Sequence, residues 1–94
     1  MRRLSQDEIA SRMVALPAWK VEKEELARTL TCKDFLAAIE FVNQVAKLAE
    51  AAGHHPDIDL RYNKVRLSLT THDAGGLTAK DFDLAAGVDL LETP

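Results

Sequence analysis

Two short runs of alternating apolar and polar residues, 57–62 and 64–70, constrain the fold of this chain most. Two such runs joined by a tight turn are typical of an antiparallel hairpin with one apolar face. A two-residue turn at Tyr62-Asn63 would pair Ile58 with Leu67, Leu60 with Val65, Asp59 with Arg66, and Arg61 with Lys64. The first two pairs are apolar and the third has opposite charges, so polarity and charge favour this register.

A second hairpin is predicted near the start of the chain. It would join a strand at residues 19–22 to a strand at residues 25–30 through a turn at Lys23-Glu24. Trp19 and Val21 would share one face of the first of these strands.

Two of three predicted helices begin with a capping box, in which a hydroxyl and a carboxylate three residues later bind the free amides of the helix start. In the helix at residues 5–14 the pair is Ser5 with Glu8. In the last helix, from Thr78 to about residue 91, the pair is Thr78 with Asp81.

The longest helix is expected at residues 33–52, with Thr31 or Asp34 as its N-terminal cap. Gly53 is suited to its C-terminal cap, because glycine adopts the left-handed conformation without steric cost. Helical spacing predicts a buried stripe made of Phe35, Ile39, Val42, Ala46 and Ala49.

The resulting order, αββαββα, predicts an α+β fold. Each hairpin has one apolar face, so the economical packing is one four-stranded antiparallel sheet with the three helices on one face. A chain of 94 residues has room for one domain, expected to span residues 1–94.

Composition excludes several classes of function. The net charge of −3 gives no general attraction to nucleic acid. Cys32 is the only cysteine, so no internal disulfide can form. No apolar run approaches the ~20 residues of a membrane span, and the start of the sequence does not look like a signal peptide. We therefore expect a cytoplasmic protein that binds neither nucleic acid nor membrane.

Three histidines, His54, His55 and His72, are the residues best suited to chemistry. The first two follow the predicted helix cap at Gly53, and the third is expected to end the second strand of the hairpin on its outer polar face. The two strands are antiparallel, so the end of the second returns to the start of the first. The sequence therefore predicts that the three imidazoles gather at one end of the hairpin.

Four interpretations of such a cluster are open. The histidines could be exposed loop residues without a role, or zinc ligands assisted by Glu50, Asp57 or Asp73, although their spacing matches no common zinc motif. A nucleophilic triad is disfavoured, because His72 and Asp73 are sequence neighbours and no serine stands in a nucleophile elbow. The fourth is metal-free acid–base catalysis, since histidine donates or accepts protons near neutral pH.

Several motifs between residues 50 and 85 resemble the pterin-4a-carbinolamine dehydratase family. In chain order they are Glu50-Ala-Ala-Gly-His54-His55-Pro56-Asp57, Tyr62-Asn63-Lys64-Val65, Leu69-Thr-Thr-His72-Asp73, Gly76-Leu77-Thr78, Asp81 and Leu84-Ala85. They span more than a third of the chain. The resemblance implies three helices on one face of a four-stranded antiparallel sheet, which agrees with the order of elements above.

The resemblance also implies a reaction. The protein would dehydrate a 4a-hydroxy-tetrahydropterin to the quinonoid dihydropterin, and so recycle the pterin cofactor of aromatic amino acid hydroxylases. His54 and His72 would be the acids, one for each face of the pterin, and His55 would mainly hold the substrate. The other residues implied in substrate binding are Glu50, Pro56, Thr71, Asp73, Ala74 and Asp81, with Glu50 and Asp81 orienting imidazoles or the pterin.

The resemblance implies no metal and no cofactor for this reaction. It implies a homodimer or a dimer of dimers, and the small core of a 94-residue chain favours self-association. The alternative function is a non-catalytic protein-binding or assembly factor on the same fold. The presence of all three histidines favours the enzyme, because a scaffold has no need of them.

Overall fold

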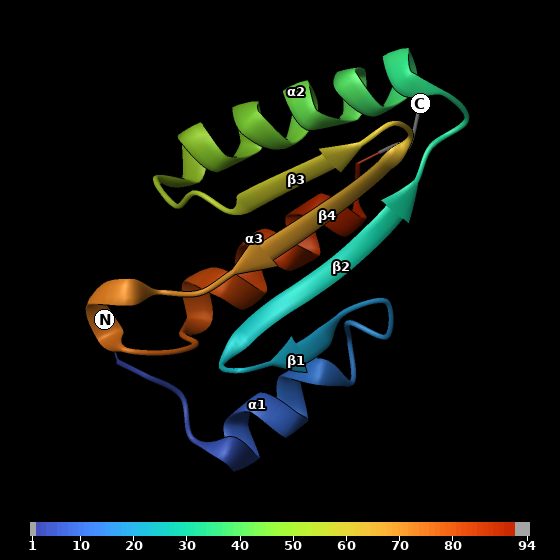
Figure 1. Ribbon diagram of the computed structural model, residues 1–94. Coiled ribbons are helices and arrows are strands. Elements are labelled where there is room, and N and C mark those ends of the chain that lie inside the picture. The colour runs from blue at the N-terminus through green and yellow to red at the C-terminus, as the bar shows by residue number, and fades with distance from the viewer. Residues whose placement is uncertain (1, 92–94) are drawn as a thin grey trace.

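The computed structural model describes residues 2–91, whose arrangement is shown in Figure 1. In chain order the elements are α1 (Gln6–Met13), β1 (Lys20–Glu22), β2 (Glu25–Thr31), α2 (Phe35–Ala52), β3 (Asp57–Arg61), β4 (Lys64–Leu69), the short 3-10 helix η1 (His72–Ala74) and α3 (Ala79–Asp89). The predicted order αββαββα and the α+β class are confirmed. None of the helices formed by residues 2–91 is long and apolar enough to cross a bilayer.

The strands form one antiparallel sheet in the order β1-β2-β4-β3. β3 and β4 pair in the predicted register, with Leu60 opposite Val65 and Asp59 opposite Arg66. Tyr62 in the connecting turn has a left-handed backbone, with φ of 53°, as two-residue hairpin turns commonly require.

The N-terminal hairpin also forms, although β1 begins at Lys20 and Trp19 lies just before it. β1 is short and pairs only with residues 25–27 of β2. β2 pairs with β4 from residue 26 to residue 31. Among the described residues, the second half of β2 therefore has a strand on one side only.

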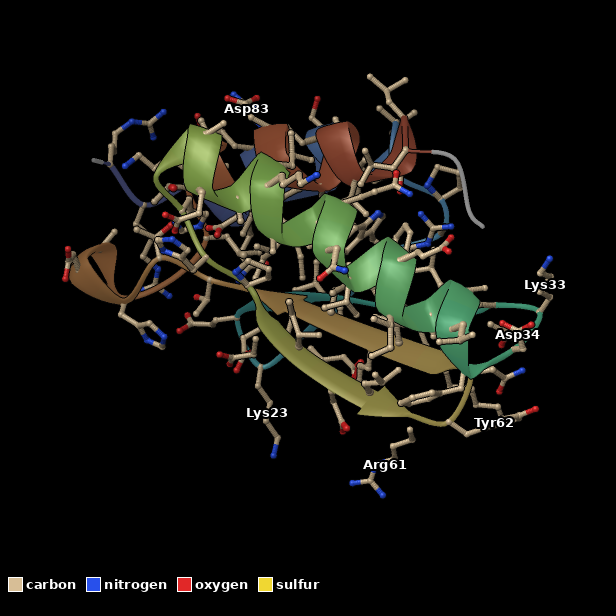
Figure 2. The ribbon with its side chains drawn as sticks, turned by 90° about the horizontal axis from the view of Figure 1, so that it is seen from above. Lys23, Lys33, Asp34, Arg61, Tyr62 and Asp83 are labelled. Carbon is tan, nitrogen blue, oxygen red and sulfur yellow. The ribbon has the colours of Figure 1, made fainter. Side chains whose placement is uncertain are left out.

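The helices lie on one side of the sheet, as Figure 2 shows, and the other side is open. The strand side chains that face the helices are buried: Leu26, Leu30, Val65, Leu67 and Leu69. They pack against buried apolar residues of the two longer helices: Phe41 and Val45 of α2, and Phe82, Leu84 and Val88 of α3. Each such side chain contributes roughly 1.5–3 kcal/mol on burial, so this layer holds the helices on the sheet.

The buried stripe of α2 differs from the predicted one. Its buried residues are Ala37, Ala38, Phe41, Val45 and Ala49. The prediction was wrong for Phe35, which is 47% exposed, and for Ala46, which is exposed, while Ile39 and Val42 are only partly buried. α2 is apolar around most of its circumference, so spacing alone could not select the buried face. Three of the buried residues are alanines, whose small side chains allow this face of α2 to pack closely against the core.

The predicted helix caps are confirmed, except that Asp34 rather than Thr31 caps α2. Asp34 accepts a hydrogen bond from the Ala37 amide at 2.8 Å, and Gly53 ends α2 with a left-handed backbone. Both predicted capping boxes are present, Ser5 with Glu8 on α1 and Thr78 with Asp81 on α3.

Candidate active site

The three histidines come from two segments that meet at one end of the β3–β4 hairpin. His54 and His55 directly follow Gly53, the cap of α2. His72 lies just beyond the end of β4. All three line one hollow of about 330 Å³, a volume within the range of roughly 300–1,000 Å³ that is common for small-molecule sites.

His72 does not continue the outer face of β4, as the sequence had predicted. β4 ends at Leu69, and His72 is the first residue of η1. The chain turns here because Thr71 and Gly76 form a β-bridge, and Gly75 adopts a left-handed backbone with φ of 75°. The turn still keeps His72 beside the other two histidines.

His54 is held by a buried carboxylate. Its Nε2 lies 2.5 Å from Oδ1 of Asp81, and the His54 side chain is 12% exposed whereas that of Asp81 is fully buried. A carboxylate in this position accepts the Nε2 proton and fixes the ring tautomer. Nδ1 is then the nitrogen that remains for a ligand.

The second oxygen of Asp81 is satisfied by the start of α3 and by the end of the hairpin. Oδ2 accepts a hydrogen bond from the Thr78 amide at 2.9 Å and from the Thr71 hydroxyl at 2.8 Å. A buried carboxylate needs such partners to offset its desolvation. One side chain thus caps α3, ties Thr71 to it and orients His54.

His55 has a different environment. Its Nε2 contacts Oε2 of Glu50, and the two side chains are 64% and 75% exposed. Exposed pairs of this kind contribute little to stability. His55 can therefore exchange Glu50 for a ligand at small cost.

The structure brings most of the predicted site residues together. Those that line the hollow are His54, His55, Thr71, His72 and Asp73. Asp81 lies behind His54, and Glu50 reaches the site through His55. Pro56 and Ala74 each follow a lining residue in the sequence but do not line the hollow themselves.

The hollow also has lining residues that the sequence interpretation missed, namely Gly53, Thr70 and Lys80. One signal could have identified Lys80. It stands in the first turn of α3, where the helix dipole disfavours a positive charge.

This geometry bears on the interpretations of the histidine cluster that the sequence left open. Within residues 2–91, no three His, Cys, Asp or Glu side chains are arranged to hold a metal ion, so the arrangement gives no support to a zinc site. A larger hollow of about 420 Å³ lies beside β1 and β2 and has no histidine in its lining. Because the imidazoles line the smaller hollow, that hollow is the candidate active site.

The fold and the site together define a small α+β protein with a hollow lined by imidazoles. A family model described as pterin 4 alpha carbinolamine dehydratase matches residues 2–91. The chain belongs to this family of dehydratases, which are hydro-lyases. The family expected from the sequence motifs is thereby confirmed.

Bacterial relatives match over nearly the whole chain. A protein of Chloroflexus aurantiacus is 63% identical over 89 residues, which cover 95% of this chain and 96% of that one. A protein of Acidobacterium capsulatum is 57% identical over 91 residues, 97% of this chain and 99% of that one. Both are named as candidate pterin-4-alpha-carbinolamine dehydratases.

Solved structures show the same fold. A crystal structure from Brucella melitensis, described as a transcriptional coactivator/pterin dehydratase, has a TM-score of 0.89 at 33% identity and covers 94% of this chain and 96% of that one. A pterin dehydratase-like protein, described as a RuBisCO assembly factor in the alpha-carboxysome, has a TM-score of 0.65 at 23% identity, covering 77% and 86%. The second likeness concerns the fold alone.

Proposed function

We propose that this protein removes water from a 4a-hydroxy-tetrahydropterin by histidine acid–base catalysis. In this reaction an acid protonates the hydroxyl on ring carbon 4a. The lone pair of N5 expels it as water, and loss of the N5 proton gives the quinonoid dihydropterin. The chemistry needs a proton donor at carbon 4a and a path for the N5 proton, and imidazoles can serve both roles.

The observation that carries the proposal is the His54–Asp81 pair at the wall of the imidazole-lined hollow. When His54 is protonated, the Asp81 carboxylate stabilises the imidazolium through Nε2, and Nδ1 can deliver its proton to the leaving hydroxyl. His72 lines the same hollow from η1. It is the second acid, suited to the opposite face of the pterin.

The remaining site residues would bind the substrate and orient it. His55, whose contact with Glu50 is exposed, holds the substrate. Thr71 and Asp73 line the hollow beside the ring, and we assign supporting contacts to Pro56 and Ala74 because of their places next to His55 and Asp73. The reaction would recycle the pterin used by aromatic amino acid hydroxylases, which leave the 4a-hydroxyl on the ring.

The test is a dehydration assay on each stereoisomer of a 4a-hydroxy-tetrahydropterin. His54→Ala and His72→Ala should each slow the chemical step by ~10²–10⁴-fold, equivalent to about 3–5 kcal/mol of transition-state stabilisation. Each loss should be largest for the isomer that the missing acid serves. His55→Ala should instead raise KM more than it lowers kcat.

The double variant His54→Ala, His72→Ala decides between enzyme and scaffold. Circular dichroism should show a folded protein, since both side chains line the hollow and the Asp81 carboxylate keeps the Thr78 amide and the Thr71 hydroxyl as partners. If this folded variant dehydrates the pterin at the parent rate, the acid–base assignment is wrong. A non-catalytic binding role on the same fold would then take first place.

A further inference from the structure

A second, smaller cavity of about 190 Å³ adjoins the imidazole-lined hollow. The two share His54 and Lys80 in their linings. The other residues of the smaller cavity come from the end of α2 and the start of α3: Leu48, Ala52, Asp83 and Leu84. In Figure 2, Asp83 lies toward the end of α2 that is opposite Asp34. His54 and Lys80 therefore form the boundary between the two spaces.

The smaller cavity combines an apolar floor with a polar rim. Leu84 is buried and Leu48 is partly buried, whereas Lys80 and Asp83 are exposed at the opening. Apolar walls favour the carbon atoms of a ligand, and a few polar groups at the opening fix the orientation of that ligand. This combination suits a short alkyl chain that carries hydroxyl groups.

The chemistry of the proposed reaction brings such a chain close to His54. Carbon 4a, whose hydroxyl His54 would protonate, is joined through N5 to ring carbon 6, so the first atom of a carbon 6 substituent lies only three bonds from the reacting atom. The pyrimidine half of the pterin, in contrast, is planar and polar throughout. A cavity that shares His54 with the hollow is thus within reach of the carbon 6 substituent.

We propose that the smaller cavity is a subsite for the carbon 6 substituent of the pterin, and that Lys80 is a specificity-determining residue at its entrance. This inference rests on the proposed function. Within residues 2–91 no ion pair engages the Lys80 ammonium. Its three donors are therefore available to hydroxyl oxygens of the chain.

The test compares two stable dihydropterins, one with a methyl group and one with a three-carbon hydroxylated chain on carbon 6. Ala52→Leu places a larger side chain in the subsite and leaves all three histidines unsubstituted. It should weaken binding of the longer ligand by at least about tenfold, the scale of a steric mismatch in a pocket, and leave the methyl ligand unaffected. Ala51→Leu, on the same helical turn but outside both linings, is the matched control.

Lys80→Met provides an independent second variant, because it removes the ammonium and keeps the length of the side chain. The quantity to compare is the ratio of the dissociation constants of the two ligands. Any effect of the substitution on binding of the pterin ring, which both ligands share, cancels in this ratio. Lys80→Met should reduce the preference for the hydroxylated chain, and Lys47→Met should not. If neither Ala52→Leu nor Lys80→Met changes the ratio, the subsite is refuted. Turnover of a 6-methyl carbinolamine by the parent protein tests the proposed function separately.

Discussion

Among single residues, Asp81 connects the local structure most directly with the proposed chemistry. Its Oδ1 holds His54, and its Oδ2 binds the Thr78 amide at the start of α3. A substitution that keeps the second contact and changes the first can separate these two effects.

Asp81→Asn is such a substitution. The amide oxygen can still accept from the Thr78 amide, but the NH₂ group donates toward His54 and so favours the ring with its proton on Nδ1. We expect kcat to fall by ~10²–10⁴-fold, as for a general acid held in the wrong tautomer. Nitrogen NMR of the neutral ring should show the proton moved from Nε2 to Nδ1. If the tautomer of His54 is unchanged and only the stability of the protein falls, Asp81 has a structural role alone.

The sequence predicted the individual histidines better than their partners. His54, His55 and His72 lie in short local motifs whose ends an antiparallel hairpin must bring together. Asp81 as a residue that orients an imidazole was implied only by the family resemblance. Its contact with His54 depends on how α3 packs against the end of α2, and the sequence pattern of neither helix specifies this. The position of Lys80 in the hollow depends on the same packing, and its place in the first turn of α3 was the one sequence signal for it.

Among the helices and strands, α3 is tied to the N-terminal hairpin by Asp89. Oδ1 of Asp89 accepts a hydrogen bond from the Trp19 indole at 2.8 Å and also from the Arg28 guanidinium. Asp89 lies in the last turn of α3, where the helix dipole disfavours a negative charge. The two donors offset this disadvantage.

Asp89→Ala should therefore lower the free energy of unfolding by about 1–3 kcal/mol, because it leaves the indole N–H of buried Trp19 without a partner. Asp89→Asn keeps an oxygen for the indole and should cost less. Urea denaturation of both variants measures the difference. Equal losses would mean that the charge on Arg28, rather than the indole, accounts for the stabilisation.

α1 carries a pH-dependent contact. The Arg2 guanidinium donates hydrogen bonds of 2.8 and 2.7 Å to the Glu8 carboxylate. Together with the Ser5 amide at 2.9 Å, it lowers the pKa of Glu8 to about 2. Because this pKa is below the ordinary value of ~4.3, the stabilisation is fully present above that value and is lost as pH falls toward 2.

Glu8→Gln removes this contribution. The variant should have a lower Tm than the parent at neutral pH, and the two should converge as pH falls from about 4.3 toward 2. Thermal denaturation at several pH values checks the convergence. A Tm difference that stays constant over this range would show that the ionised carboxylate does not stabilise α1.

The β3–β4 hairpin and α2 show what sequence periodicity can and cannot decide. In the hairpin a one-residue slip would move Leu60 and Leu67 to the open face, so only one register buries them. In α2 several faces are apolar, and the choice between them depends on how closely the helix can approach the sheet. Ala38 and Phe41 are buried whereas Leu36 is 71% exposed, a result of packing rather than of pattern.

For the whole molecule, the free edge of β2 predicts self-association. Residues 28–31 pair with β4 on one side and have no β1 partner on the other. Exposed strand edges pair readily with another chain, and a second copy would extend the sheet symmetrically. We expect a dimer or a dimer of dimers by light scattering at micromolar concentration, and a monomer mass would contradict this.

All residues of the proposed acid–base machinery lie in the continuous segment from Glu50 to Asp81. This segment closes through a two-residue turn, and such hairpins form within about 1–10 μs. The pairing of β2 with β4 joins residues much farther apart in sequence, so its loop-closure cost is higher and its formation slower. The imidazoles can thus come together early in folding. The first half of the chain supplies core contacts but none of these groups. Substitutions there should therefore change the stability of the protein more than its turnover.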